Sequence, residues 1–190
     1  RATAAILLIG AAGLGVSGLT ERPLVPPRSE PEAPQAVRVI TYNIHMGFDA
    51  RGLPAAESIA RVIEAADADV VALQEVGRGW TVNGGADLAS WLQWRFPGYR
   101  LIYGPMNGDL WGNAILTRLD VFASGSLRFP LRESRFQRGL TWANLSTPRG
   151  PLLVIDTHFA HDSDEDRLEQ AADLLSFWRG RGRTAVLGDL

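Results

Sequence analysis

Residues 37–43 read VRVITYN, a short run of β-branched and aromatic residues that ends on an amide side chain, Asn43. This composition predicts a β-strand. Three further apolar stretches are followed closely by an ionisable residue: residues 70–73 by Glu75, residues 152–157 by His158, and residues 184–187 by Asp189. The chain therefore pairs buried strands with polar residues at their carboxyl ends.

Three segments have the periodicity of amphipathic helices. The first covers residues 55–66, the second lies around Trp91 and closes at Pro97, and the third covers residues 164–179. The apolar residues that we expect to face the core recur at helical spacing: Ile59, Val62, Ile63 and Ala66 in the first helix, and Leu168, Ala171, Ala172 and Leu175 in the third.

Further strands are predicted in the middle of the chain, at residues 100–103, 113–116, 121–127 and 140–145, with a hairpin turn at residues 148–151. Helices thus alternate with apolar strands at both ends, and a run of strands lies between them. This order predicts an α/β fold in which helices are layered on a mixed sheet.

The composition excludes several classes of protein. The 190 residues contain no cysteine, so disulfide scaffolds, thiolate metal sites and cysteine nucleophiles are ruled out. The net charge is −2. Nucleic-acid binding draws much of its affinity from phosphate neutralisation by basic residues, so this balance counts against a nucleic-acid partner.

The amino-terminal segment differs from the rest. Residues 2–19 contain no charged residue, and 18 residues of helix span roughly 27 Å, close to the thickness of a bilayer core. We expect a transmembrane helix over residues 1–20, with a cleaved secretory signal or a buried helix as the alternatives. Residues 21–36 carry five prolines and are predicted to form an extended linker. The folded domain would then occupy residues 37–190.

The polar residues at the strand ends indicate a site, because strand ends in layered α/β folds line the ligand crevice. An amide beside two carboxylates suits a hard, oxygen-preferring cation such as Mg²⁺, and a single histidine among them argues against structural zinc. Each residue also has an ordinary structural role: Asn43 and Asp189 could cap turns, Glu75 could pair with a surface arginine, and His158 could be a core histidine. On residue types alone the sequence is compatible with a metal-assisted hydrolase.

Five motifs follow one another along the chain: VITYNIH at residues 39–45, VALQE at 71–75, GNAILTR at 112–118, THF at 157–159 with Arg167 and Gln170 downstream, and LGDL at 187–190. In this order they resemble the endonuclease/exonuclease/phosphatase superfamily, which includes deoxyribonuclease I and neutral sphingomyelinases. Within that superfamily, NIHMGFD at 43–49, DLWG at 109–112 and THFAHD at 157–162 look most like the carboxyl-terminal domain of the GPI-anchor lipid remodelling proteins. Those proteins carry the domain behind transmembrane helices.

The resemblance implies a layered α/β sandwich of the deoxyribonuclease I type with mixed sheets, and a role for each motif residue. Glu75 and Asn43 would form the metal site: Glu75 would ligate Mg²⁺, with Mn²⁺ as the alternative ion, and Asn43 beside it would orient a metal-bound water or the phosphate. His158 would donate to a phosphate oxygen, and Asp189 would orient the attacking water.

Two further residues are candidate phosphate contacts, Asn113 and Arg138. Asn113 could instead make an ordinary loop hydrogen bond, and Arg138 could lie on a solvated face, because most arginines are exposed.

The resemblance also implies motifs that this sequence does not contain. In the family an asparagine follows Leu190, and a later Asp-His pair supplies a further carboxylate and the principal acid/base histidine. We therefore expect an incomplete domain. A 190-residue chain without these groups is expected to be catalytically inactive or nearly so, whereas the longer parent protein is expected to be active.

The function that these observations predict is a membrane-tethered, Mg²⁺-dependent phosphodiesterase or phosphatase that acts on a lipid or a GPI-like lipid-linked phosphate. The resemblance implies an extracytoplasmic domain beside the bilayer. The alternatives are a nuclease of the same fold and a non-catalytic module that binds lipid head groups. Replacing Glu75 by glutamine separates enzyme from binding module, because only an enzyme would lose its function.

Overall fold

The computed structural model describes residues 36–132 and 135–190. The predicted transmembrane helix and all but the last residue of the predicted linker lie outside this range. Among the described residues, no helix has both the length and the apolar character that crossing a membrane requires.

Eight strands form two four-stranded sheets. The first sheet has the order β1-β2-β4-β3, and the second has the order β5-β6-β7-β8. The strands of the first sheet are β1 (Val39–Asn43), β2 (Val70–Gly77), β3 (Arg100–Asn107) and β4 (Trp111–Thr117). Those of the second are β5 (Val121–Arg128), β6 (Gly139–Leu145), β7 (Leu152–His158) and β8 (Thr184–Asp189).

Each sheet is mixed, as predicted. In the first sheet β1 pairs with β2 in parallel and the other neighbours are antiparallel. In the second sheet β7 pairs with β8 in parallel and the other neighbours are antiparallel. The two sheets pack face to face through an apolar layer that includes Ala72, Ile115 and Val154.

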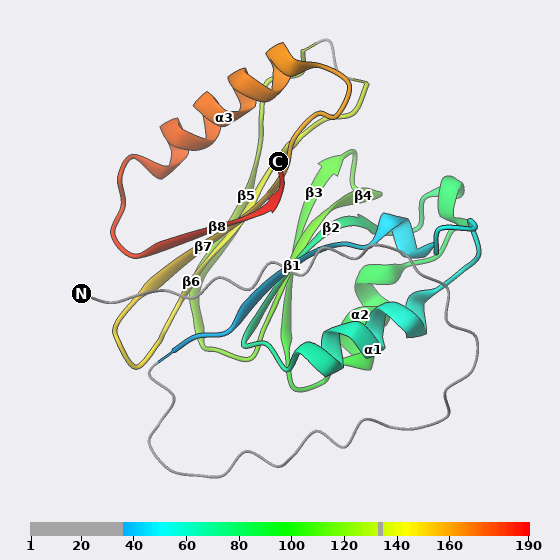
Figure 1. The fold of residues 1–190 in the computed structure, drawn as a ribbon, viewed down its shortest axis with the longest axis horizontal. Coiled ribbons are helices and arrows are strands. Elements are labelled where there is room, and N and C mark those ends of the chain that lie inside the picture. Colours follow the sequence, from blue (N-terminus) through cyan, green and yellow to red (C-terminus); the bar gives the residue numbers. More distant parts are fainter. Residues whose placement is uncertain (1–35, 133–134) are drawn as a thin grey trace.

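Helices cover the outer faces of the sandwich (Figure 1). Helices α1 (Ala56–Ala66) and α2 (Leu88–Arg95) pack on the first sheet, and α3 (Asp164–Trp178) packs on the second. Short 3₁₀ turns, η1 (His45–Gly47) and η2 (Thr81–Asn83), follow β1 and β2. Strands β2, β4 and β7 are buried along almost their whole length because both faces of each sheet are covered.

The predicted strands and helices are present, and most strands are longer than predicted. The prediction of which residues face the core was partly wrong for two helices. In α1, Val62 is exposed and Ala60 is buried instead. In α3, Leu168 and Leu175 are 74% and 57% exposed, whereas Gln170 and Leu174 are buried.

The physical reason for the shift in α3 is a buried polar contact. The Gln170 side-chain oxygen accepts a hydrogen bond from the Ala160 amide at 2.8 Å. A buried backbone donor needs such a partner, so this bond turns the Gln170 face of the helix toward the sheet. Leu168 and Leu175, seven residues apart, lie away from that face and are left exposed.

The topology brings the two parallel strand pairs together. Strands β1 and β8, each at one edge of its own sheet, lie in contact. Their carboxyl ends therefore meet at one end of the sandwich, and β2 and β7 end beside them.

Candidate active site

Three of the predicted residues meet where β1, β2 and β8 end. The Asn43 amide nitrogen donates to Glu75 Oε1 at 3.1 Å and to Asp189 Oδ2 at 2.9 Å. The Asn43 amide oxygen in turn accepts from the His45 backbone N–H at 2.9 Å. Residues 146 positions apart in the chain are thus held together by one amide group, which keeps two carboxylates close to each other.

Glu75 reaches this point because β2 contains a β-bulge. Leu73 pairs with Ala114 and Val76 pairs with Gly112, so two residues of β2 lie opposite one residue of β4. Glu75 has φ of +59°, a left-handed conformation that is uncommon for a residue with a side chain. A bulge of this kind re-aims one side chain out of the normal alternation of the strand. Here the re-aimed side chain is the Glu75 carboxylate.

His158, at the end of β7, lies beside Asp189. Its Nε2 is 3.6 Å from Asp189 Oδ2, and the imidazole is buried. Burial, reinforced by the positive charge of Arg138, lowers the pKa of His158 to about 3, although the Asp189 carboxylate acts in the opposite direction. The imidazole is therefore neutral at pH 7 and can act as a hydrogen-bond donor without adding a positive charge.

Arg138 is buried rather than solvated. The guanidinium lies over the ring of Trp111, 5.2 Å from its centroid, and its Nη2 is 3.4 Å from Nδ1 of His161. Nε and Nη1 are buried and have no hydrogen-bond partner among the described residues. Burial lowers the pKa of this guanidinium, and the carboxylates of Glu75 and Asp189 oppose that effect. The arrangement is a desolvated cation with two free donors, which suits an anionic ligand.

Asn113 lies inside strand β4, so the ordinary loop role does not apply to it. The side chain is buried, and neither its amide nitrogen nor its amide oxygen has a partner within the described structure. Residues two apart in a strand share a face, so Asn113 lies on the same face of β4 as Trp111, whose ring is 5.8 Å from that of His158. Ile115, two residues further along β4, belongs to the layer between the two sheets, so Asn113 faces that layer as well.

Several residues of this region were missed at the level of sequence. Trp111 and Phe136 frame Arg138, and Trp80 makes edge contacts with both rings. Asp156 is buried in β7 and accepts a hydrogen bond from Gln74. A charged residue in the apolar run 152–157 was the signal that could have identified Asp156. Nothing in the spacing of the aromatic residues indicated that they meet.

The carboxylates of Glu75 and Asp189 are the groups that could hold a cation. No cluster of three or more histidine and carboxylate side chains arranged for a metal occurs in the described part of the chain. Mg²⁺ commonly takes one or two protein carboxylates and completes its shell with water and substrate phosphate. The two oxygen donors held by Asn43 fit that pattern. The Asn43 oxygen is already engaged by His45, so this geometry places Asn43 as the group that holds the two ligands.

A hollow of about 160 Å³ opens beside these residues. Its lining combines the site histidine with basic and acidic neighbours: His158, Phe159, Ala160, His161, Arg167, Asp189 and Leu190. The hollow is large enough for a phosphate group and a bound water. It lies at the end of the sandwich where the strand ends meet.

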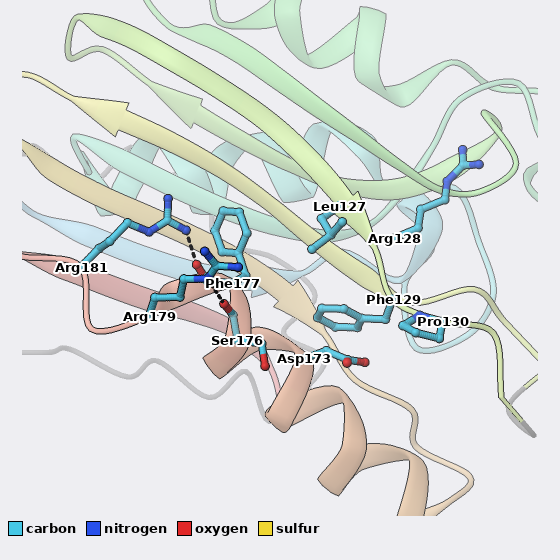
Figure 2. Close-up of a pocket in the computed structure, with 9 residues that line it drawn as sticks. All are labelled: Leu127, Arg128, Phe129, Pro130, Asp173, Ser176, Phe177, Arg179 and Arg181. Carbon is cyan, nitrogen blue, oxygen red and sulfur yellow. Dashed lines mark hydrogen bonds between the residues drawn. The ribbon is translucent and has the colours of Figure 1, made fainter.

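A larger hollow of about 650 Å³ lies elsewhere, between β5 and α3 (Figure 2). It contains none of the predicted site residues. Of its three arginines, Arg179 and Arg181 donate to the carbonyl oxygens of Ser176 and Phe177 at the end of α3, and Arg128 donates to the carbonyl oxygens of Pro105 and Gly108. These arginines bind backbone carbonyl groups, and the predicted site residues lie instead at the strand ends.

Solved structures share this fold. An endonuclease/exonuclease/phosphatase from Bacteroides vulgatus is 22% identical with a TM-score of 0.66, and the match covers 81% of this chain and 65% of that chain. A mannosyl-6-phosphatase from Bacteroides thetaiotaomicron is 20% identical with a TM-score of 0.64, over 81% and 65% of the two chains. TDP2 from D. rerio, complexed with a single-strand DNA product, is 19% identical with a TM-score of 0.64, over 80% and 58%.

At these identities the likeness establishes the fold alone. The chain spans about 65% of the length of the first of these structures. No curated protein matches the sequence. A family profile does match, over residues 40–190, which include every predicted site residue. From this match over most of its length, the chain belongs to the endonuclease/exonuclease/phosphatase family.

Proposed function

We propose that this chain forms the catalytic core of a divalent-metal-dependent phosphoester hydrolase. The observation that carries the proposal is the pair of carboxylates, Glu75 and Asp189, held by the Asn43 amide beside a neutral His158 and a buried Arg138. Members of the family are phosphoesterases and nucleases that generally depend on a divalent metal. Acidic ligands next to unpartnered donors match what a cation and a phosphate together require.

Each residue has a distinct task in the proposed reaction. Glu75 would hold the cation, with the Asp189 carboxylate beside it, and Asn43 keeps both carboxylates in place. Asp189, half exposed at the mouth of the site, orients the attacking water and accepts its proton. When bound, Mg²⁺ supplies a Lewis acid that polarises the phosphoryl group, and Mn²⁺ is the alternative ion.

The donors of the site stabilise the charge that develops on phosphate oxygens. Neutral His158 donates through one ring nitrogen, and the guanidinium of Arg138 contributes a fixed positive charge. Both side chains are buried, and a desolvated donor interacts with an anion more strongly than one in water. Asn113 supplies a further amide from the layer between the sheets.

For the substrate we propose a lipid or a GPI-like lipid-linked phosphoester. The uncharged residues 2–19 and the motifs shared with GPI-anchor lipid remodelling proteins support a membrane-tethered enzyme with an extracytoplasmic domain. Because the chain spans about 65% of the first similar structure, we assign full activity to a longer protein that contains this domain. A nuclease is the second candidate, favoured by the likeness to TDP2 complexed with a single-strand DNA product, but the net charge of −2 counts against it.

The test is hydrolysis by the longer protein in detergent, with and without Mg²⁺, on bis(p-nitrophenyl) phosphate, sphingomyelin, a phosphoinositide and plasmid DNA. Glu75→Gln is the matched variant, because it preserves the volume of the side chain and its contact with Asn43 but removes the charge. Lipid turnover that requires Mg²⁺ and is lost by at least 100-fold in Glu75→Gln supports the proposal. DNA cleavage alone would indicate a nuclease, and absence of turnover on every substrate would indicate a binding module.

A further inference from the structure

A polar contact crosses the apolar interior of the sandwich close to the candidate site. The side-chain nitrogen of Gln74, in β2, donates to Asp156 Oδ1, in β7, at 2.6 Å, and it also reaches Thr41 Oγ1 at 3.1 Å. Gln74 and Asp156 are fully buried, at 1% and 0% exposure. Two positions earlier in each strand the residues are apolar, Ala72 and Val154, and belong to the layer between the sheets.

Gln74 directly precedes Glu75, and the two residues form the bulge. Val71, Leu73 and Val76 pack against helices α1 and α2 on the outer face of the sheet. Without an extra residue, Val76 would point into the layer between the sheets, because side chains alternate along a strand. Gln74 keeps the inward orientation, and Glu75 is the residue that leaves the alternation.

The bulged register needs support from elsewhere in the fold. A left-handed backbone at a residue such as Glu75 is unfavourable and persists only when the surroundings hold it. A shift of the register by one residue would turn Gln74 away from the second sheet and leave the Asp156 carboxyl without its donor. Since buried polar groups require partners, the Gln74–Asp156 bond favours the register that contains the bulge.

We propose that Asp156 is a positioning residue, which anchors Gln74 from the second sheet and so holds the bulge that aims Glu75 at the site. The proposal rests on the proposed function in one respect, the assignment of Glu75 as a metal ligand. Burial raises the pKa of the Asp156 carboxyl well above its usual range, and the hydrogen bond from Gln74 opposes this shift. Asparagine has the same shape and keeps a side-chain oxygen that can accept the hydrogen bond from Gln74.

Three variants test this role. Asp156→Ala removes the acceptor, and Asp156→Asn retains an acceptor oxygen in a side chain of the same shape. Val154→Ala is the matched control, since it lies in the same strand and the same buried layer but has no polar contact. Mn²⁺ binding is measured by calorimetry, and amide hydrogen exchange is followed over residues 70–77.

Asp156→Ala is expected to weaken Mn²⁺ binding by about 10-fold or more, the usual effect of removing a group that orients a metal ligand. It should also speed amide exchange over residues 70–77. Asp156→Asn should bind Mn²⁺ within about 3-fold of the parent chain, a rescue expected of a positioning role. Val154→Ala should lose thermal stability but keep its Mn²⁺ affinity.

Equal Mn²⁺ affinity and equal exchange in Asp156→Ala and Val154→Ala would overturn the positioning role. If the unsubstituted chain binds Mn²⁺ no better than Glu75→Gln, the proposed function fails. The amide exchange of Asp156→Ala compared with Val154→Ala still decides whether Asp156 holds the bulge. If Asp156→Ala does not fold, Gln74→Met breaks the same bond from the other side and is compared with Val154→Ala in the same way.

Discussion

The buried guanidinium of Arg138 allows a test in which stability and binding should change in opposite directions. Arg138→Met keeps an unbranched apolar stem and removes the charge and all donors. A side chain that served the fold would lose stability on this change. A side chain that is kept for binding an anion should instead gain stability and lose affinity.

The magnitude follows from the contacts of the guanidinium. Two buried donors, Nε and Nη1, lack partners, and each such group costs roughly 1–3 kcal/mol in the folded state. Two kinds of contact offset part of this cost in free energy. The guanidinium lies over the rings of Trp111 and Phe136, at 5.2 and 6.0 Å from their centroids, and nearby carboxylates attract its charge. Cation–π contacts contribute about 0.5–2 kcal/mol each, so the variant should be more stable by on the order of 1 kcal/mol. For a domain of this size that raises Tm by about 2–4 °C.

The assay combines urea unfolding with calorimetric titration of inorganic phosphate. We expect phosphate affinity to fall by about 10-fold or more, because a charge-assisted contact is lost. Arg132→Met is the matched control. Arg132 is paired with Asp173 at 2.8 Å and with Glu169, so its loss should lower stability and leave phosphate binding unchanged. The reasoning is refuted if Arg138→Met is destabilised and binds phosphate as tightly as the parent chain.

Two further predictions concern pH and packing. The pKa of His158 is lowered by burial to about 3, below the value of about 6.5 in an unfolded chain, so its contribution to stability is present above pH 6.5 and is lost as the pH falls toward 3. Between pH 7 and pH 5 the parent chain should lose about 2 kcal/mol more unfolding free energy than His158→Gln, as measured by urea denaturation. The raised pKa of Asp156 acts in the opposite direction but is common to both proteins, so equal pH dependence would contradict the prediction. Gly112→Ala would place a Cβ 2.1 Å from the Gly104 carbonyl oxygen, and we expect a loss of about 1–3 kcal/mol. Gly98→Ala, where the Cβ meets nothing within 4 Å, is the control, and equal stability of the two variants in the same unfolding assay would contradict this reading.

The local sequence pattern was sufficient to predict the helices and strands and the fold class. The periodicity of residues 55–66 predicted α1 because the spacing of apolar residues along a helix is a property of neighbouring residues. The strand ends at Asn43, His158 and Asp189 were recognisable for the same reason, whereas Glu75 lies inside β2, at its bulge. The side of α3 that faces the sheet could not be predicted from the spacing of its leucines, because a hydrogen bond from the Ala160 amide to Gln170 turns a different face toward the sheet.

The sequence by itself determined the order of strands and helices, the family motifs and the residue types from which a phosphoester site can be built. Only the tertiary structure decided how these residues are used. It buried Arg138 beside Trp111, turned Glu75 out of its strand, and joined Gln74 to Asp156 across the two sheets. Burial and contacts between sheets depend on residues far apart in the chain, so no local pattern encodes them.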